Sequence, residues 1–423
     1  MADVLLISYP PAQKPKDMQS PCPPLDACII ASMLETGGHT VAVYDVAVEE
    51  SPLDKILASE RPSIVGLAVP SAALQPAERD LAIIRSVLPG AKVVLTGQHV
   101  TGDPSITSGM GVDYGVRGFP CAGFTRLSEF IMQGIGSLEE IEGLVRHAGN
   151  KITLSNSKHA ESEKIPFPAW HLLDIKRYNY FPIAGSLGCP FRCDYCRSTG
   201  PFYPWRDDYL PRPPADIVAE IKQGASLGIS TFDFIDGVFT HDRKWVNDLC
   251  GLLEEECPKA RWACSTRPDK ANLEILKAMK KAGCVQVSMG VESGCERVRR
   301  ANGRDITDRT IRQAFQDCRK AGLNARATAI IGLPGETSSE IEDTLAFISE
   351  LRPAHAGFYP AILVPGSKLL DRAIKEGIMP RDAWTLYMQG RMQIPIYLPE
   401  GITREEISNY LKDAHSNFYN IPL

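Results

Sequence analysis

Short apolar segments alternate with amphipathic stretches along almost the whole chain, and this alternation limits the fold more than any other feature. Strands and helices in this order form parallel sheets that carry helices on their faces. The pattern occurs in residues 3–130 and again from residue 182 onward, with a polar, proline-containing segment between them. A chain of 423 residues is also too long for one ordinary domain. The sequence therefore predicts an α/β protein with two main domains.

The first half contains five predicted strands separated by helical segments. These strands span residues 3–9, 40–46, 63–69, 91–97 and 112–118. In such sheets ligands bind beyond the carboxyl ends of the strands, where the strand order reverses. No G-x-G-x-x-G sequence follows the first strand, so the pattern does not favour a dinucleotide. We expect a flavodoxin-like or Rossmann-like domain with its candidate binding loops after the strands.

The second half repeats a strand and a helix six times, which is typical of a partial (β/α)6 barrel. Its predicted strands span residues 181–188, 230–237, 260–267, 284–293, 324–336 and 354–367. Barrel enzymes build their sites at the carboxyl ends of the strands. The expected boundaries are 1–140 for the first domain, 141–180 for a linker, 181–375 for the barrel and 376–423 for a short C-terminal extension.

Three cysteines follow the first barrel strand in the sequence GCPFRCDYC, with Cys189, Cys193 and Cys196 at C-x3-C-x2-C spacing. Three thiolates so close together can bind three irons of a cubane cluster and leave the fourth iron open to a small molecule. A zinc site is the simpler alternative, but it needs a further ligand from elsewhere. The next cysteines, at 250, 257 and 264, are too far apart to form a typical zinc pair. The spacing favours an open iron–sulfur site and hence an enzyme.

CPFRCDYC resembles the signature of the radical S-adenosylmethionine (SAM) enzymes, in which an aromatic residue, here Tyr195, precedes the last cysteine. The resemblance implies a [4Fe–4S] cluster on the three cysteines. It also implies that the amine and carboxylate of SAM fill the open iron site, where one electron cleaves SAM to a 5′-deoxyadenosyl radical. The motifs of the later strands follow in the order that the family shows.

The resemblance extends to residues at the ends of these later strands. The residues that it assigns to SAM are Tyr195, Asp236, Gly237, Arg267, Glu292, Gly332 and Leu333. Asp236 offers an acceptor for the amino group, and Arg267 can bind the carboxylate with its fork of donors. The alternatives are a solvated turn aspartate and a surface salt bridge. Glu292, in GVESG, resembles the family's G-I-E-S-G, and GLPGE resembles a loop that passes close to adenine.

The order of elements in the first half resembles the cobalamin-binding domain that precedes many radical SAM modules. The segments VDYGVRGFP and LTGQH resemble two of its loops, and PFPAWHLLD resembles the bridge to the barrel. The residues that the resemblance assigns to cobalamin are Tyr9, Pro10, Ser71, Gly97, Gln98, His99 and Gly118. The D-x-H-x-x-G motif is absent, and no histidine occurs before His39. A histidine from that loop therefore cannot bind the lower face of the cobalt.

Cobalamin-dependent members of the family imply methylation of an unactivated carbon. One SAM methylates cobalamin, and a second generates the radical that activates the substrate. We favour a peptide or protein substrate, as for the enzymes that methylate methyl-coenzyme M reductase, although a small metabolite fits as well. A ferredoxin or flavodoxin is the expected reductant. The alternatives are a radical SAM cyclase or rearrangement enzyme with a degenerate cobalamin domain, and a non-enzymatic iron–sulfur or zinc module.

Charge and composition limit the partners and the compartment. A net charge of −5 gives no electrostatic reason to expect nucleic acid. The apolar run at the amino terminus lacks a basic flank and is too short to cross a bilayer. Twelve cysteines without a secretion signal are typical of a reducing cytoplasm, and an open cluster favours an anaerobic host.

Overall fold

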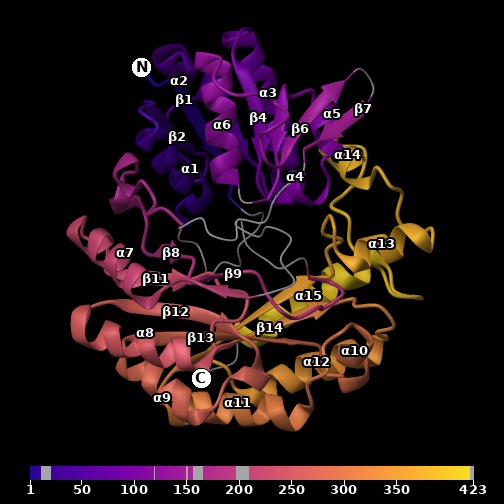
Figure 1. Ribbon diagram of the computed structural model, residues 1–423. Helices are drawn as coiled ribbons and strands as arrows, with labels where there is room; N and C mark the ends of the chain where they lie inside the picture. Colours follow the sequence, from indigo (N-terminus) through magenta and orange to yellow (C-terminus); the bar gives the residue numbers. More distant parts are fainter. Residues whose placement is uncertain (11–20, 119, 149–150, 156–164, 197–208, 420–423) are drawn as a thin grey trace. The chain divides into compact units, whose positions relative to one another are not determined.

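The computed structural model describes residues 1–10, 21–118, 120–148, 151–155, 165–196 and 209–419. The chain forms two compact units, each built on its own sheet (Figure 1). The described residues of the first unit come from Met1–Phe181 and Arg381–Ile394, and those of the second from Pro182–Ser198, Asp207–Pro380 and Pro395–Leu423. Each unit is described separately below.

The first unit is built on a seven-stranded sheet in the order β2-β1-β3-β4-β5-β6-β7. Its strands are β1 (Val4–Ser8), β2 (Val41–Asp45), β3 (Ile64–Ala68), β4 (Lys92–Thr96), β5 (Tyr114–Val116), β6 (Leu144–Ala148) and β7 (Lys151–Leu154). The first five are parallel, and all five were predicted from the sequence. Because β1 lies between β2 and β3, the strand order reverses beside β1. This reversal is the position at which doubly wound sheets bind ligands.

The helices of the first unit cover both faces of this sheet. They are α1 (Leu25–Thr36), α2 (Leu53–Glu60), α3 (Leu74–Val87), α4 (Gln98–Gly102), α5 (Ile106–Met110) and α6 (Pro120–Gln133). Helix α1 packs with α6, and α2 packs with α3. Right-handed crossovers place α1 on one face and α2 and α3 on the other, because the chain winds in opposite directions from β1 and from β2. Helix α6 joins α1 on its face. Gly66 in β3 allows the close approach of α6, since a Cβ there would lie 2.7 Å from the ring of Phe124.

The first unit extends beyond the boundary expected from the sequence. Residues 141–155, predicted as part of a linker, contain β6 and β7, which join the sheet as antiparallel edge strands. Part of the predicted C-terminal extension also belongs to this unit, because α14 (Ala383–Met388) packs against α3 and α5. The described part of the chain therefore divides differently from the predicted segments 1–140, 141–180 and 376–423.

The second unit is built on a six-stranded sheet in the order β15-β14-β13-β12-β11-β8. Its strands are β8 (Phe181–Ile183), β11 (Thr231–Phe234), β12 (Arg261–Thr266), β13 (Cys284–Glu292), β14 (Asn324–Ile331) and β15 (His355–Pro360). Neighbours in the sheet follow one another along the chain, and the paired strands from β11 to β15 are parallel. This is the singly wound arrangement of a partial barrel, and all six predicted strands are present.

Helices follow the barrel strands and lie on one side of the sheet (Figure 1). They are α7 (Pro214–Ser226), α8 (Arg243–Glu256), α9 (Leu273–Lys281), α10 (Glu296–Ala301), α11 (Asp308–Lys320), α12 (Ser338–Leu351) and α13 (Lys368–Lys375). Side-chain caps fix where several begin: Asp242 caps α8, Asn272 caps α9, and Thr307 caps α11. A last helix, α15 (Arg404–Tyr419), packs against β15 and α12. Because the paired strands from β11 to β15 are parallel, their carboxyl ends share one edge.

Candidate active site

The three motif cysteines lie in the loop that follows β8 and the short strand β9 (Ser186–Leu187). The side chains of Cys189, Cys193 and Cys196 are partly exposed. Two backbone hydrogen bonds hold the loop to the rest of the second unit. The amide of Asp194 donates to the carbonyl of Asn302 at 3.2 Å, and its carbonyl accepts from the amide of Leu369 at 2.9 Å. The loop is therefore anchored on both sides, which leaves the thiols available as ligands.

The three cysteines of this loop suit the ligand geometry of a cubane cluster. Among the residues that the structure describes, no group of three His, Cys, Asp or Glu side chains surrounds one point closely enough to hold one metal ion. A cubane cluster does not need that convergence, because each thiolate binds a different iron. Three cysteines on one short loop therefore match the ligand set of a [4Fe–4S] cluster with one open iron.

Two buried guanidinium groups supply positive charge beside this loop. Arg267, which directly follows β12, is 6% exposed, and its Nη1 lies 3.9 Å from the Cys193 sulfur. Arg304 is also 6% exposed. Its Nη2 donates to the carbonyl of Gly290 at 2.5 Å, and its Nη1 lies 3.5 Å from Glu292 Oε1. A negatively charged thiolate–iron site is stabilised by such charges. The sequence offers no motif that identifies Arg304.

Glu292 ends β13 in a strained backbone conformation. Its φ angle is +68°, and the pairing of β13 with β14 shifts register between Gly290 and Glu292. Non-glycine residues adopt this conformation at a cost of about 1–3 kcal/mol, and such residues often cluster at functional sites. Burial raises the pKa of its carboxyl group, while the charges of Arg304 and Arg267 oppose that shift. The strand end predicted to contact SAM is thus an irregular one.

Asp236 lies at the end of β11, as predicted, but the protein itself already binds its carboxylate. It is 2% exposed. Oδ2 accepts from the amide of Gly185 at 2.9 Å, and Oδ1 accepts from the hydroxyl of Ser186. Burial raises the pKa of this carboxyl group to about 6, and these hydrogen bonds oppose the shift. The contacts fix residues 185–186 just before the cysteine loop, whereas the predicted contact with the SAM amine stays a prediction.

The GLPGE loop after β14 is held from inside by Glu336. Its Oε2 accepts from the amides of Gly332 at 2.8 Å and Leu333 at 3.1 Å, and its Oε1 accepts from the hydroxyl of Ser293 at 3.1 Å. Gly332 has a φ angle of +90°, which only glycine adopts readily. The two amides predicted to lie near SAM therefore bind a carboxylate of the same loop.

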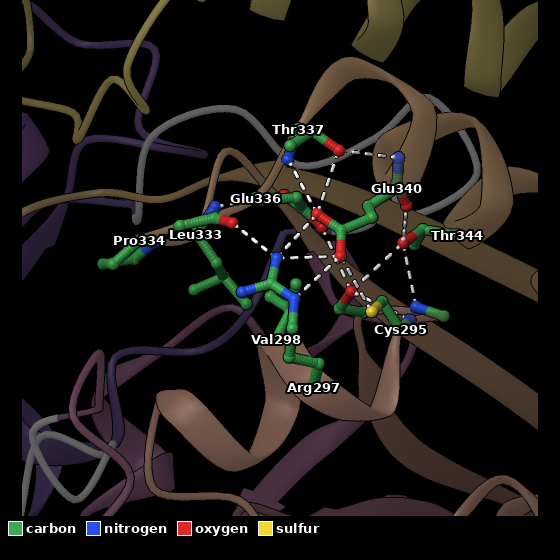
Figure 2. A network of polar contacts seen from close by, with 12 residues as sticks. Cys295, Arg297, Val298, Leu333, Pro334, Glu336, Thr337, Glu340 and Thr344 are labelled. Carbon is green, nitrogen blue, oxygen red and sulfur yellow. Dashed lines mark hydrogen bonds and ion pairs between the residues drawn. The ribbon is translucent and has the colours of Figure 1, made fainter.

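A second set of contacts braces the GLPGE loop from outside (Figure 2). The guanidinium of Arg297 donates to the carbonyl of Gly335 at 2.7 Å and to both carboxylate oxygens of Glu340 at 2.8 Å. Thr337 and Glu340 form a capping box at the start of α12. The Thr344 hydroxyl accepts from the amide of Gly294 at 2.8 Å. The loops after β13 and β14 are thus cross-linked, which fixes the two strand ends relative to one another.

Glu336 is expected to make the stability of the protein depend on pH. Burial raises its pKa to about 7 from an ordinary value of 4.5, so the folded protein holds the proton more tightly than the unfolded chain. The contribution of Glu336 to the free energy of unfolding is largest below pH 4.5. It decreases by at most about 3 kcal/mol as the pH rises from 4.5 to 7. We expect the difference in free energy of unfolding between Glu336→Gln and the wild type to change over this interval. Urea unfolding at pH 5, 6 and 7 measures it, and a constant difference would contradict the assignment.

In the first unit, the predicted cobalamin residues lie at the carboxyl ends of the parallel strands. The Ser71 hydroxyl, after β3, lies 2.9 Å from Nδ1 of His99, after β4. His99 is 0% exposed, and burial lowers the pKa of its imidazole to about 4, so the ring is neutral at pH 7. Gly97 has a φ angle of +103°, and a Cβ there would lie 3.1 Å from the amide nitrogen of Val69. The ends of β3 and β4 therefore meet closely.

The other residues predicted to bind cobalamin make their contacts apart from the Ser71–His99 pair. Tyr9, at the end of β1, is buried, and its hydroxyl donates to Asp80 Oδ2 on α3 at 2.9 Å. Pro10 is exposed, and Gln98 begins α4. Gly118, after β5, donates its amide to the hydroxyl of Thr101 at 3.0 Å. These residues share one edge of the sheet, and the described contacts join Ser71 to His99 and Tyr9 to Asp80.

A segment from near the carboxyl terminus also lies at this edge, and no local sequence signal predicts it. The ring of Trp384 on α14 meets the ring of His99 edge to face, with 5.4 Å between centroids. The hydroxyl of Tyr387 donates to the carbonyl of Ala72 at 2.8 Å, and its carbonyl accepts from Gln75 at 2.6 Å. Residues almost three hundred positions apart in the chain therefore surround the Ser71–His99 pair.

Comparison with known proteins decides the family. Residues 183–348 match the radical SAM superfamily, and residues 17–120 match the B12 binding domain. The protein is a cobalamin-dependent radical SAM enzyme. Its cofactors are accordingly a [4Fe–4S] cluster, SAM and cobalamin. The two matched regions lie in the second and first units, where the cysteine loop and the Ser71–His99 pair were found.

Individual relatives of this radical SAM enzyme are moderately similar over nearly the whole chain. An uncharacterized methyltransferase of Pyrococcus horikoshii is 29% identical over 95% of this chain and 88% of its own. An anaerobic magnesium-protoporphyrin IX monomethyl ester cyclase of Cereibacter sphaeroides is 25% identical over 94% of this chain and 67% of its own. The comparisons as a whole support the methyltransferase branch of the family.

A solved structure shares the fold of the radical SAM enzyme described here. The radical SAM methyltransferase TsrM of Kitasatospora setae, with cobalamin and a [4Fe–4S] cluster bound, superposes with a TM-score of 0.75. It is 18% identical, over 90% of this chain and 76% of that one. This confirms the predicted order of a B12-binding domain followed by a radical SAM barrel. Among the described helices, none is both long and apolar enough to cross a membrane.

Proposed function

We propose that the protein methylates an unactivated carbon by cobalamin-dependent radical SAM chemistry. The observation that carries the proposal is a single one: a loop with three cysteines at C-x3-C-x2-C spacing follows the first barrel strand of a chain that also folds a B12-binding domain. When bound, the cluster supplies the electron that cleaves SAM, and cobalamin supplies the methyl group. The protein itself contributes ligands, position and electrostatics.

The roles of the second unit follow from its contacts. Cys189, Cys193 and Cys196 hold the cluster, and Arg267, which follows β12, places its guanidinium beside Cys193. Glu292, on its strained strand end, and the braced GLPGE loop offer hydrogen-bonding groups to SAM. Tyr195 packs within the loop with a buried hydroxyl, and burial raises the pKa of its phenol. This phenol therefore stays protonated and takes no part as a base.

In the first unit we assign Ser71 and His99 to cobalamin, with Trp384 fixing the imidazole ring. The assignment is supported by the match to the B12 binding domain and by the neutral, buried state of His99. A neutral ring keeps one nitrogen as donor and the other as acceptor, so it can bond Ser71 and still present a polar atom elsewhere. Gly97 keeps the backbone close to Val69 and leaves no room for a side chain.

Replacement of His99 is expected to weaken cobalamin binding. A single neutral hydrogen bond is worth about 1 kcal/mol, so His99→Phe should raise the dissociation constant by roughly 5- to 10-fold. Retention of cobalamin on a desalting column and titration by absorbance measure the effect. His171→Gln is the matched control, because His171 lies in the same unit with a side chain that is 54% exposed. Equal affinity in the two variants would remove His99 from the site.

The reaction can be tested directly with methyl-labelled SAM and candidate substrates under anaerobic conditions. We expect the label on a carbon of the product together with one 5′-deoxyadenosine per turnover, both measured by mass spectrometry. A peptide or protein substrate stays a prediction, as do the ferredoxin or flavodoxin reductant and the cytoplasmic, anaerobic setting. Failure of the purified protein to bind cobalamin or to transfer the label would contradict the proposal.

A second candidate is a cyclase or rearrangement enzyme of the same family. The similarity to the cyclase of Cereibacter sphaeroides, which covers 94% of this chain, favours it. The same experiment separates the two candidates. A cyclase would form 5′-deoxyadenosine and a product that has lost hydrogen, without the labelled methyl group.

A further inference from the structure

We propose that Arg267 positions the cysteine loop and that its charge raises the reduction potential of the cluster. The inference rests on the proposed role of Cys189, Cys193 and Cys196 as cluster ligands. It gives Arg267 a role that does not involve SAM, whereas the sequence predicts that this residue binds the SAM carboxylate. Three independent contacts of one side chain carry the inference.

The first contact is with the loop itself. The guanidinium carbon of Arg267 lies 3.8 Å from the centroid of the Phe191 ring, and Phe191 stands between the first two ligand cysteines. At this distance a guanidinium stacks on an aromatic face, where both dispersion and the ring quadrupole favour it. Lys270 is the other cation near this ring, and its ammonium lies farther away, at 5.7 Å. The stacking holds the middle of the C-x3-C segment against the end of β12.

The second contact fixes the plane of the guanidinium. Nε lies 2.9 Å from Asp269 Oδ1, and Nη2 lies 3.2 Å from Asp269 Oδ2. Two parallel bonds to one carboxylate allow little rotation. Because this edge of the guanidinium is already occupied, it is not available as the fork for a SAM carboxylate.

The third contact directs the remaining nitrogen to a ligand. Nη1 lies 3.9 Å from the sulfur of Cys193, and the Arg267 side chain is only 8% exposed. Hydrogen bonds to ligand sulfurs and nearby positive charge stabilise the reduced cluster, because reduction adds one negative charge. The carboxylate of Asp269 partly offsets this charge, but that side chain is 30% exposed and is therefore better screened by water. The net effect is a higher reduction potential.

The test separates charge from geometry with three variants, all measured without SAM. Arg267→Gln removes the charge, Arg267→Lys keeps the charge but loses the planar fork, and Phe191→Leu removes the stacking partner. Arg261→Gln is the control, because Arg261 begins the same strand at its opposite end and is exposed. The readouts are the midpoint potential from a redox titration followed by electron paramagnetic resonance, and the rate of iron loss to a chelator.

We expect the midpoint potential of Arg267→Gln to be more negative than that of the wild type. The potentials of Arg267→Lys and Phe191→Leu should lie near the wild-type value. The last two variants should lose iron several-fold faster than the wild type, since they loosen the loop. A wild-type potential in SAM-free Arg267→Gln, or an equal drop in Arg261→Gln, would overturn the electrostatic role. If Arg267→Gln holds too little iron for a titration, wild-type iron retention in both other variants would overturn the positioning role.

The same measurements distinguish this inference from the proposed function. A wild-type protein that takes up no iron on reconstitution would contradict the cluster ligands themselves. If the wild-type protein takes up iron and the variants keep its SAM-free potential and its iron retention, the role proposed here for Arg267 is wrong while the cluster ligands stand. A shift in the SAM-free potential supports the electrostatic role, and faster iron loss from Arg267→Lys and Phe191→Leu supports the positioning role.

Discussion

Cys196→Ser is expected to abolish cluster assembly and, with it, reductive cleavage of SAM. The serine hydroxyl is a poor ligand for iron at neutral pH, whereas the thiolate is the form that binds metal. Loss of a group that merely supports a ligand already costs about 10- to 100-fold in metal affinity, so loss of the ligand should cost at least ~100-fold. Iron content and the formation of 5′-deoxyadenosine from SAM measure the two effects.

The control for this variant is Cys257→Ser. Cys257 is also a partly exposed cysteine of the second unit, and it follows α8 rather than the cysteine loop. The Cys257→Ser variant should keep the iron content and the SAM cleavage of the wild type. Cobalamin retention should be the same in both variants, because the B12-binding domain has its own sheet and core. Wild-type iron content in Cys196→Ser would place the cluster elsewhere in the chain.

The strands and the cysteine loop could be predicted because their signals are local. Buried parallel strands are continuous apolar runs, so both sheets are visible in the sequence wherever strands are covered on both faces. Strands β6 and β7 lack such a run, because they pair as an antiparallel hairpin at the edge, and β6 includes Arg146 and His147. The segment therefore looks polar and resembles a linker, although it belongs to the first sheet.

The site residues that were missed depend on contacts between distant parts of the chain. Trp384 reaches His99 only because α14 returns to the first unit, and no spacing rule connects these positions. Arg304 and Glu336 are charged residues in ordinary loop sequences, and their roles follow from burial. Arg267 was found by its place at a strand end, but its stacking on Phe191 is visible only in three dimensions. Strand ends thus identify where a site lies, whereas partners decide what each residue does.

Arg212→Met is expected to cause the largest loss of stability outside the cysteine loop. Nη2 of Arg212 lies 2.7 Å from Glu220 Oε2 on α7, and the two side chains are 7% and 3% exposed. Removal of one partner leaves the other charge buried and uncompensated, which typically costs 3–5 kcal/mol. Glu220 is already poorly solvated, since burial raises the pKa of its carboxyl group despite the charge of Arg212. The midpoint of urea unfolding should fall accordingly.

This variant should also weaken the cluster, because Arg212 supports the strand that leads into the cysteine loop. Its Nη1 donates to the carbonyl of Ala184 at 2.9 Å, and its amide donates to the carbonyl of Gly185 at 2.9 Å. Gly185 in turn donates to Asp236. Loss of the side chain therefore loosens the residues just before Cys189, and we expect faster loss of iron at temperatures where the protein is still folded.

Two further variants separate the buried charge from the geometry. Lys222 lies on α7, as Glu220 does, and Lys222→Ala breaks its ion pair with Glu256 of α8; because that pair is exposed, we expect little change in the free energy of unfolding. The double variant Arg212→Met/Glu220→Leu removes both buried charges and should recover most of the lost stability, because apolar groups of similar size replace such pairs at little cost. It should not recover iron retention, since the bond to Ala184 is still missing. Full recovery of both properties would show that Arg212 only neutralises Glu220 and does not position the cysteine loop.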